Sequence, residues 1–147
     1  MMIIDSIPGD KSISHRAIII GSLVKGSTTF DGFLLSDDCL STLEIFRQLG
    51  ITIEIEGTCI TICGKGPMGL TKPKGVLDVG NSGTGIRLIS GVLAGLPFES
   101  QITGDDSIQH RPMGRIIEPL TEMGASIASS HQRPPLSLTG QAHLKKG

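Results

Sequence analysis

The spacing of apolar residues predicts two helices in the first half of the chain. One runs over 12–24, with Ser12 as the N-cap, a hydrophobic body, and Lys25-Gly26 as its end. The other follows the cap residue Ser36 and ends at Gly50. Its apolar positions recur every three or four residues, at Leu40, Leu43, Phe46 and Leu49. This second helix is the clearest amphipathic segment of the sequence.

Alternation of apolar and polar residues predicts strands next to these helices. Residues 51–56 alternate strictly, Gly57-Thr58 can form a turn, and residues 59–63 alternate again, which is typical of a β-hairpin. Residues 28–30 are β-branched and aromatic, which favours a short strand. The first half is therefore predicted to run helix, strand, helix, hairpin.

The second half repeats this order. The pattern predicts helices over 82–94 and 112–123, a strand over 101–103, and a weaker hairpin from 125–129 and 136–138. The first of these helices begins at the cap pair Asn81-Ser82. Pro119 falls inside the second and should kink it or delay its start.

Equivalent positions in the two halves lie about 70 residues apart, which indicates an internal duplication. Arg16 and Arg87, for example, are separated by 71 residues. We interpret the chain as two copies of one α/β unit, 1–70 and 71–147, within one domain. A repeat architecture normally ends with a capping unit, and none precedes Gly147, so we expect the chain to be a fragment.

Composition narrows the functional classes. The 147 residues suit one domain, and 13 Lys and Arg against 14 Asp and Glu give a net charge of −1, which excludes a strongly basic nucleic-acid binder. Three cysteines without a Cys-x-x-Cys pair indicate reduced thiols rather than a disulfide framework or a zinc site. The sequence shows neither a signal peptide nor an apolar span of about 18 residues. We therefore expect a cytoplasmic protein with no nucleic-acid partner, membrane contact, metal or cofactor.

Lys11, Ser12 and Arg16 form the first candidate site. A helix N-terminus presents free backbone N–H groups and the positive end of its dipole, both of which favour an anion. Arg16, one turn into the helix, points back toward that end, so two cations and a hydroxyl could hold a phosphate or carboxylate. A routine cap with solvated basic residues fits the spacing equally well. His15 is interpreted as a surface or packing histidine rather than a general base.

Residues 80–87 form the second candidate site. Gly83 and Gly85 remove side chains from a helix start, so that a ligand can approach the backbone closely. Polar contacts could come from Asn81, Ser82 and Thr84. The pattern is neither a Walker A loop nor a dinucleotide fingerprint, and taken alone it also fits a simple turn.

Arg111 is the third candidate. It precedes Pro112, which suits the first turn of a helix, and a guanidinium held there could bind a carboxylate or phosphate bidentately. For an isolated residue, an ordinary exposed arginine is the simpler interpretation. The acidic residues near predicted helix starts are interpreted as caps: Asp37, Asp38, Asp105 and Asp106. No general acid or base and no nucleophilic triad can be assembled from the sequence.

Read together, three segments closely resemble the 5-enolpyruvylshikimate-3-phosphate synthase family. They are PGDKSISHRA at 8–17, GNSGTGIRL at 80–88 and RPM at 111–113, and the resemblance covers nearly the whole chain. It implies the inside-out barrel fold of the enolpyruvyl transferases, in which each of two domains contains three βαβαββ units. The chain would hold two of the six units, both from the N-terminal domain, with the usual leading strand shortened to 1–7.

The resemblance implies transfer of the enolpyruvyl group of phosphoenolpyruvate to the 5-hydroxyl of shikimate 3-phosphate, with release of phosphate, in chorismate and aromatic amino-acid biosynthesis. Family positions that bind shikimate 3-phosphate match Lys11, Ser12 and Arg16. Those on the phosphoenolpyruvate side match Lys11, Asn81, Gly83, Thr84 and Arg111. Lys11 matches a catalytic lysine, whereas Arg87 is interpreted as structural. Glyphosate, which binds on the phosphoenolpyruvate side, is expected to inhibit the full-length enzyme, itself expected to be a monomer.

The resemblance also implies what this chain lacks. The family's acid/base carboxylates and its further Lys and Arg ligands come from later segments, so we expect the chain to be inactive without the missing C-terminal part. Two alternatives stay open: a non-catalytic anion-binding module of the same fold, and a relative of UDP-N-acetylglucosamine enolpyruvyl transferase. The start of that second enzyme lacks the Lys-Ser-x-Ser-x-Arg sequence found at 11–16.

Overall fold

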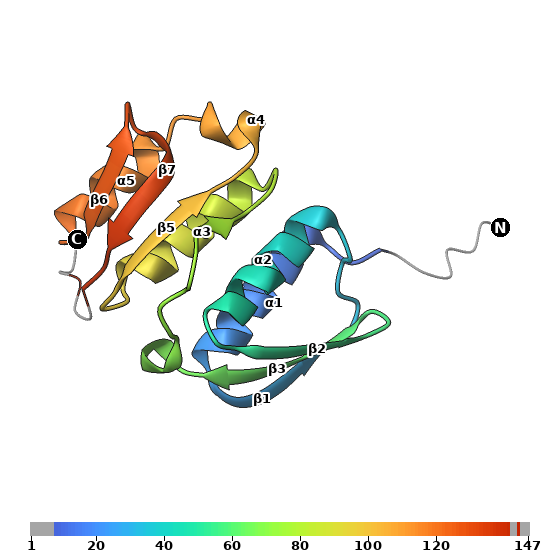
Figure 1. Ribbon diagram of the computed structural model, residues 1–147. Coiled ribbons are helices and arrows are strands. Elements are labelled where there is room, and N and C mark those ends of the chain that lie inside the picture. The colour runs from blue at the N-terminus through green and yellow to red at the C-terminus, as the bar shows by residue number, and fades with distance from the viewer. Residues whose placement is uncertain (1–7, 142–143, 145–147) are drawn as a thin grey trace.

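The protein has a mixed α/β fold in which helices pack on two small sheets (Figure 1). The computed structural model describes residues 8–141 and 144. The predicted leading strand at 1–7 lies outside the described residues.

The first half forms a three-stranded antiparallel sheet with two helices. Its elements are α1 (Lys11–Leu23), β1 (Lys25–Phe30), α2 (Asp37–Gln48), β2 (Thr52–Glu56) and β3 (Cys59–Lys65), with strand order β1-β3-β2. Glu56 pairs with Cys59, so Gly57-Thr58 form the predicted two-residue turn, with Gly57 at φ 60°. The amphipathic pattern of α2 is also confirmed, because all its predicted apolar positions are buried except the partly exposed Leu40.

The predicted cap of the first helix is wrong. Asp10 is the N-cap of α1, and its Oδ1 accepts a hydrogen bond from the Ile13 N–H at 2.8 Å. Ser12 therefore lies inside the first turn, because the preceding carboxylate already takes the free N–H group. At the other end, Val24 is already extended (φ −85°, ψ 145°), so Lys25-Gly26 belongs to β1 and forms no connecting loop.

The second half forms a four-stranded sheet with its own helices. Its elements are η1 (Pro67–Gly69), β4 (Leu77–Asp78), α3 (Gly83–Ala94), β5 (Glu99–Thr103), α4 (Asp106–Gln109), α5 (Gly114–Glu122), β6 (Ser126–Ser130) and β7 (Arg133–Thr139). The strand order is β4-β5-β7-β6, with β4 and β5 parallel and the other pairs antiparallel. The sequence pattern missed β4 and α4, which are only two and four residues long.

The helix predicted over 112–123 starts later than expected. Met113 is the N-cap of α5 and has a non-helical backbone (φ −113°). Its N–H donates to the carbonyl of Gln132, in the turn between β6 and β7, at 2.8 Å. Pro112 therefore precedes α5, and its predicted place in the first helical turn is wrong. Pro119 lies inside α5 as predicted.

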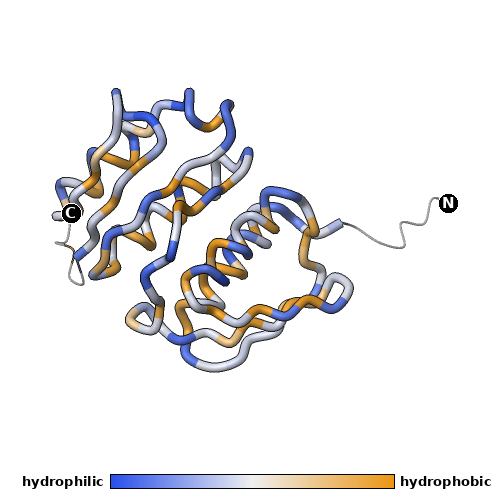
Figure 2. Tube along the Cα trace, in the orientation of Figure 1, coloured by the Kyte–Doolittle hydropathy of each residue, from blue (hydrophilic) through white to orange (hydrophobic). Residues whose placement is uncertain are grey.

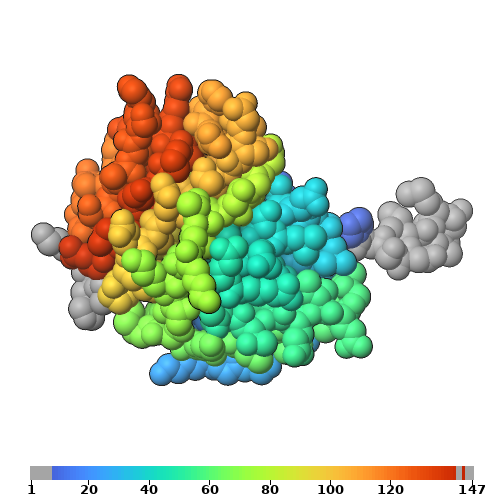
Figure 3. All heavy atoms as spheres, viewed as in Figure 1, coloured from blue at the N-terminus to red at the C-terminus, as the bar shows by residue number. Residues whose placement is uncertain are grey.

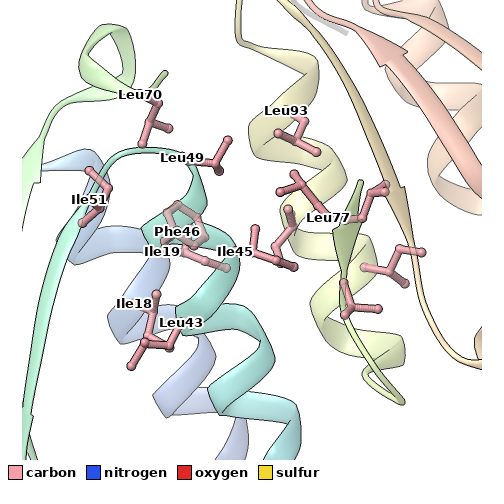
Figure 4. Close-up of a cluster of buried hydrophobic side chains, with 14 of the residues drawn as sticks. Ile18, Ile19, Leu43, Ile45, Phe46, Leu49, Ile51, Leu70, Leu77 and Leu93 are labelled. Atoms are coloured by element: carbon pink, nitrogen blue, oxygen red, sulfur yellow. The ribbon is translucent and has the colours of Figure 1, made fainter. Parts of the chain in front are cut away.

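The two halves share one hydrophobic core. Helix α2 packs against both α3 and β4, and Figure 4 shows its Ile45 on the side that faces Leu77 and Leu93, all three fully buried. Hydrophobic residues gather where the helices and strands face one another (Figure 2), and the halves are in contact on the face drawn in Figure 3. The relative placement of α1, α2 and α3 is therefore set by packing rather than by loops.

Candidate functional site

The first turns of α1, α2 and α3 lie at one end of the molecule (Figure 1). This arrangement brings the candidate residues from the two halves close together, because α1 and α3 both pack against α2. The end of the molecule that they form is called the N-terminal face below.

Lys11 opens α1 and forms an ion pair with Asp38, which lies in the first turn of α2. The Lys11 side chain is 51% exposed and that of Asp38 is 16% exposed. The predicted cap role of Asp38 is wrong, because Ser36 is the N-cap of α2 and Asp38 lies inside its first turn, where it pairs with a candidate ligand-binding cation. The partner lies 27 residues further along the chain, and no local pattern could have identified it.

Ser12 and Arg16 are both exposed on the first two turns of α1. The Arg16 Nη1 group donates to the Ser12 carbonyl at 3.1 Å. The guanidinium thus lies over the start of its own helix, as the sequence predicted. A cation in this position adds its charge to the free N–H groups of the helix N-terminus.

Gly83 opens α3 between two arginine side chains. A Cβ atom built at Gly83 would lie 2.6 Å from Arg111 Nη1 and 3.3 Å from Arg87 Nη1. Arg87 also donates from Nη1 to the Gly83 carbonyl at 2.8 Å. Arg111 is only partly exposed, and its guanidinium lies against the start of α3. The glycine lets both guanidinium groups approach the backbone of the helix start.

Ser82 and Asn81 hold the loop before α3. The Ser82 Oγ accepts from the Gly85 N–H at 2.9 Å, which confirms the predicted cap. The Asn81 Nδ2 donates to Asp105 Oδ2 at 2.6 Å. That bond is the main reason why the pKa of Asp105 lies below its usual value, and the hydrogen bond from the Ile108 N–H lowers it further. The Ile108 bond also makes Asp105 the N-cap of α4, as predicted. Thr84 is exposed in the first turn of α3.

His15 joins the three helices beneath these groups. Its side chain is fully buried, with Nδ1 2.8 Å from Thr42 Oγ1 of α2 and Nε2 3.4 Å from Ser82 Oγ at the start of α3. Burial lowers the pKa of His15, the charges of Lys11 and Arg16 lower it further, and Asp38 opposes them. It is a packing histidine, one of the two interpretations left open, and its partners 27 and 67 residues away carry no sequence signal.

The N-terminal face is suited to anions. Four cationic side chains, Lys11, Arg16, Arg87 and Arg111, lie beside two helix N-termini. Such groups bind phosphate or carboxylate through charge and directed N–H donors. The described residues contain no cluster of three or more His, Cys, Asp or Glu arranged for a metal ion, and every helix they form is too short or too polar to cross a bilayer.

Comparison with known proteins gives a consistent result. Residues 3–147 match the model of the family described as EPSP synthase (3-phosphoshikimate 1-carboxyvinyltransferase). A 3-phosphoshikimate 1-carboxyvinyltransferase of Shouchella clausii is 56% identical over 136 residues, 91% of this chain and 32% of the relative. The corresponding protein of Enterococcus faecalis is 52% identical over 141 residues, 95% of this chain and 33% of the relative.

Comparison with solved structures points to the same family. An EPSP synthase structure from Acinetobacter baumannii superposes with a TM-score of 0.90 at 46% identity, covering 95% of this chain and 32% of that one. The chain thus spans about a third of the length of the relatives that it matches.

Proposed function

Because the chain belongs to the EPSP synthase family, we propose that it forms part of the active site of a 3-phosphoshikimate 1-carboxyvinyltransferase. The reaction joins the 5-hydroxyl oxygen of shikimate 3-phosphate to C2 of phosphoenolpyruvate, with loss of the hydroxyl proton, while C3 gains a proton. The tetrahedral intermediate then loses a C3 proton and inorganic phosphate. The observation that carries the proposal is the gathering of four cations and two helix N-termini on the N-terminal face.

Lys11, Ser12 and Arg16 are the proposed contacts for shikimate 3-phosphate. Ser12 adds a hydroxyl donor in the first turn of α1, and Arg16 already lies over that turn. A phosphate could replace the Ser12 carbonyl as the partner of Arg16 and gain a charge-assisted hydrogen bond. Lys11 would bind the ligand in competition with Asp38.

Phosphoenolpyruvate, and glyphosate in its place, is proposed to bind at the start of α3. The proposed contacts are Lys11, Asn81, Gly83, Thr84 and Arg111. The absence of a side chain at Gly83 allows the Arg111 guanidinium to lie against the helix start, where it can meet a carboxylate or phosphate together with backbone N–H groups. The bond to Asp105 fixes the Asn81 side chain beside this site.

These groups would act chiefly by electrostatics. Preorganised cations stabilise the negative charge on phosphate and carboxylate as the tetrahedral centre forms. Lys11 is the proposed catalytic lysine, because it matches the catalytic lysine of the family and its ammonium group lies half exposed among the helix starts of the N-terminal face. Proton transfer at C3 is assigned to groups in the two thirds of the relatives' length that this chain does not cover.

We further propose that the chain contains two of six βαβαββ units, 1–70 and 71–147, in the N-terminal domain of a cytoplasmic enzyme. The strand orders support this division, since β1-β3-β2 in the first half has the same connectivity as β5-β7-β6 in the second. Shikimate 3-phosphate, phosphoenolpyruvate and the uncovered part of the enzyme are the proposed partners.

An NMR titration of the chain with shikimate 3-phosphate, before and after phosphoenolpyruvate is added, tests the proposal. We expect saturable shifts at 11–16 that disappear in Arg16→Ala. Arg133→Ala is a matched control, because Arg133 is exposed on β7 outside the candidate site. A well-dispersed spectrum without shifts would contradict ligand binding by this chain. Turnover restored by a polypeptide that covers the remaining two thirds would distinguish an enzyme part from a non-catalytic module.

A further inference from the structure

His15 is a buried titratable residue that the proposed ligand contacts do not use. Its side chain has no exposed surface, so a ligand bound on the N-terminal face cannot touch it. Burying an imidazole without hydrogen bonds costs free energy, and both ring nitrogens of His15 face polar atoms from other helices. The ring therefore acts through its partners, Thr42 and Ser82.

The hydrogen-bond donors and acceptors around the ring favour one of its two neutral tautomers. The Ser82 Oγ already accepts from the Gly85 N–H, so its own hydroxyl hydrogen can donate to Nε2 of His15. In that arrangement the single N–H group of the neutral imidazole is on Nδ1 and donates to Thr42 Oγ1 at 2.8 Å. The opposite tautomer would direct both the Gly85 and the His15 N–H groups at Ser82 Oγ, and the Ser82 hydroxyl hydrogen would then lose the ring nitrogen as its acceptor.

We propose that His15 is a positioning residue, whose neutral Nδ1–H tautomer fixes the N-cap of α3 against α1 and α2. Through Ser82 it would hold the start of α3, and with it Gly83 and Arg111, at a fixed distance from Lys11 on α1. The inference deepens the proposed function and rests on it only for the identity of the ligands.

The charged groups around the ring favour this neutral form. Lys11 and Arg16 lie on the same helix as His15, and Asp38 approaches from α2. The two cations and burial oppose a positive charge on the ring, and Asp38 alone favours it. A second proton on Nε2 would also compete with the donated Ser82 hydroxyl. Acid conditions should therefore release the start of α3.

NMR of the 147-residue chain with ¹⁵N-labelled histidine reads the tautomer directly. We expect the His15 ring nitrogens to show the Nδ1–H form and to titrate below the ordinary histidine pKa of 6.5. An Nε2–H ring, or titration at or above the ordinary value, would overturn the proposal.

Amide hydrogen exchange at Gly85 tests the mechanical consequence. His15→Phe keeps a planar ring but removes both hydrogen bonds, and we expect Gly85 exchange to become about fivefold faster or more, the ratio typical of one lost buried hydrogen bond. His15→Asn, which keeps a donor and an acceptor, should restore much of the protection, and His131→Phe should change nothing. Unchanged Gly85 exchange in His15→Phe would overturn the proposal.

Thr42→Val provides a second test that can be used if His15→Phe does not fold. It removes the acceptor of the Nδ1–H group while preserving the side-chain shape, so we expect the ring to shift toward the Nε2–H form. A ring that keeps its wild-type tautomer in Thr42→Val contradicts the positioning role. If the histidine measurements agree but the wild-type chain binds neither ligand, the proposed function fails and the positioning role stands.

Discussion

A methyl group added at Gly83 would displace the Arg111 guanidinium, and the structure sets the size of the displacement. The new Cβ would lie 2.6 Å from Arg111 Nη1, whereas ordinary van der Waals contact begins at 3.4 Å. Nη1 must therefore move by 3.4 − 2.6 = 0.8 Å. The obstacle is the end of a flexible side chain, so the arginine moves and the backbone stays in place.

The displacement should weaken ligand binding rather than the fold. A hydrogen bond of about 2.9 Å that lengthens by ~0.8 Å is lost, and a bond to a charged group contributes about 1.5–3 kcal/mol. We therefore expect phosphoenolpyruvate and glyphosate to bind roughly 10- to 100-fold more weakly to Gly83→Ala. Gly83 is not in the left-handed region, and alanine favours a helix over glycine by about 1 kcal/mol, so the melting temperature should not fall.

Steady-state kinetics of a full-length protein that carries this sequence provide the assay. The KM for phosphoenolpyruvate and the inhibition constant for glyphosate are measured for the parent, Gly83→Ala and Gly91→Ala. Gly91 is the matched control, because it lies in the same helix and a Cβ there meets nothing within 4 Å. Equal inhibition constants for the parent and Gly83→Ala would refute the reasoning. A lower melting temperature would show that the backbone, and not Arg111, gives way.

Four further predictions concern charge, pH and activity. Asp38→Asn should change the free energy of unfolding by less than about 1 kcal/mol, because Lys11 is half exposed, and should tighten shikimate 3-phosphate binding measured by NMR. Asn81→Ala should raise the pKa of Asp105 toward its ordinary value in a carboxyl-carbon titration; an unchanged pKa would show that Asn81 is not its main cause. Because folding lowers the pKa of His15, the unfolded chain takes up the proton first as the pH falls. The free energy of unfolding, measured by urea denaturation, should therefore decrease below about pH 6.5. The decrease should be smaller in His15→Phe. The chain alone should release no phosphate from the two substrates; release that requires both would contradict this.

Elements fixed by neighbouring residues were predictable from the sequence. The hairpin around Gly57 and the Ser82 cap depend on residues within a few positions, and the structure confirms both. The Ser12 cap was wrong because Asp10 competes for the same free N–H groups, and propensity alone does not rank the two. Strand β4 was missed because two residues show no alternation, and its pairing with β5 is a tertiary contact.

The candidate site was predictable in its members but not in its connections. Lys11, Arg16 and Gly83 stood out through charge and spacing at helix starts. Asp38 and His15 gained their roles only in three dimensions, since each lies far along the chain from the residues it contacts. Hydrophobic periodicity cannot reveal such pairs, because the spacing of residues within one helix does not specify which other helix it packs against.

The shared core explains how two separate segments come together on the N-terminal face, where we propose that anions bind. A helix start binds an anion weakly when its groups are solvated and mobile, because ordering them costs conformational entropy. Here α2 packs against both helices: Ile45 packs on the side of β4 and α3, while Asp38 and Thr42 of the same helix contact Lys11 and His15 of α1. Much of the ordering cost is therefore met by folding, before a ligand arrives. A change that loosens α2 should consequently weaken both ligand sites together, whereas Gly83→Ala should weaken only the site at α3.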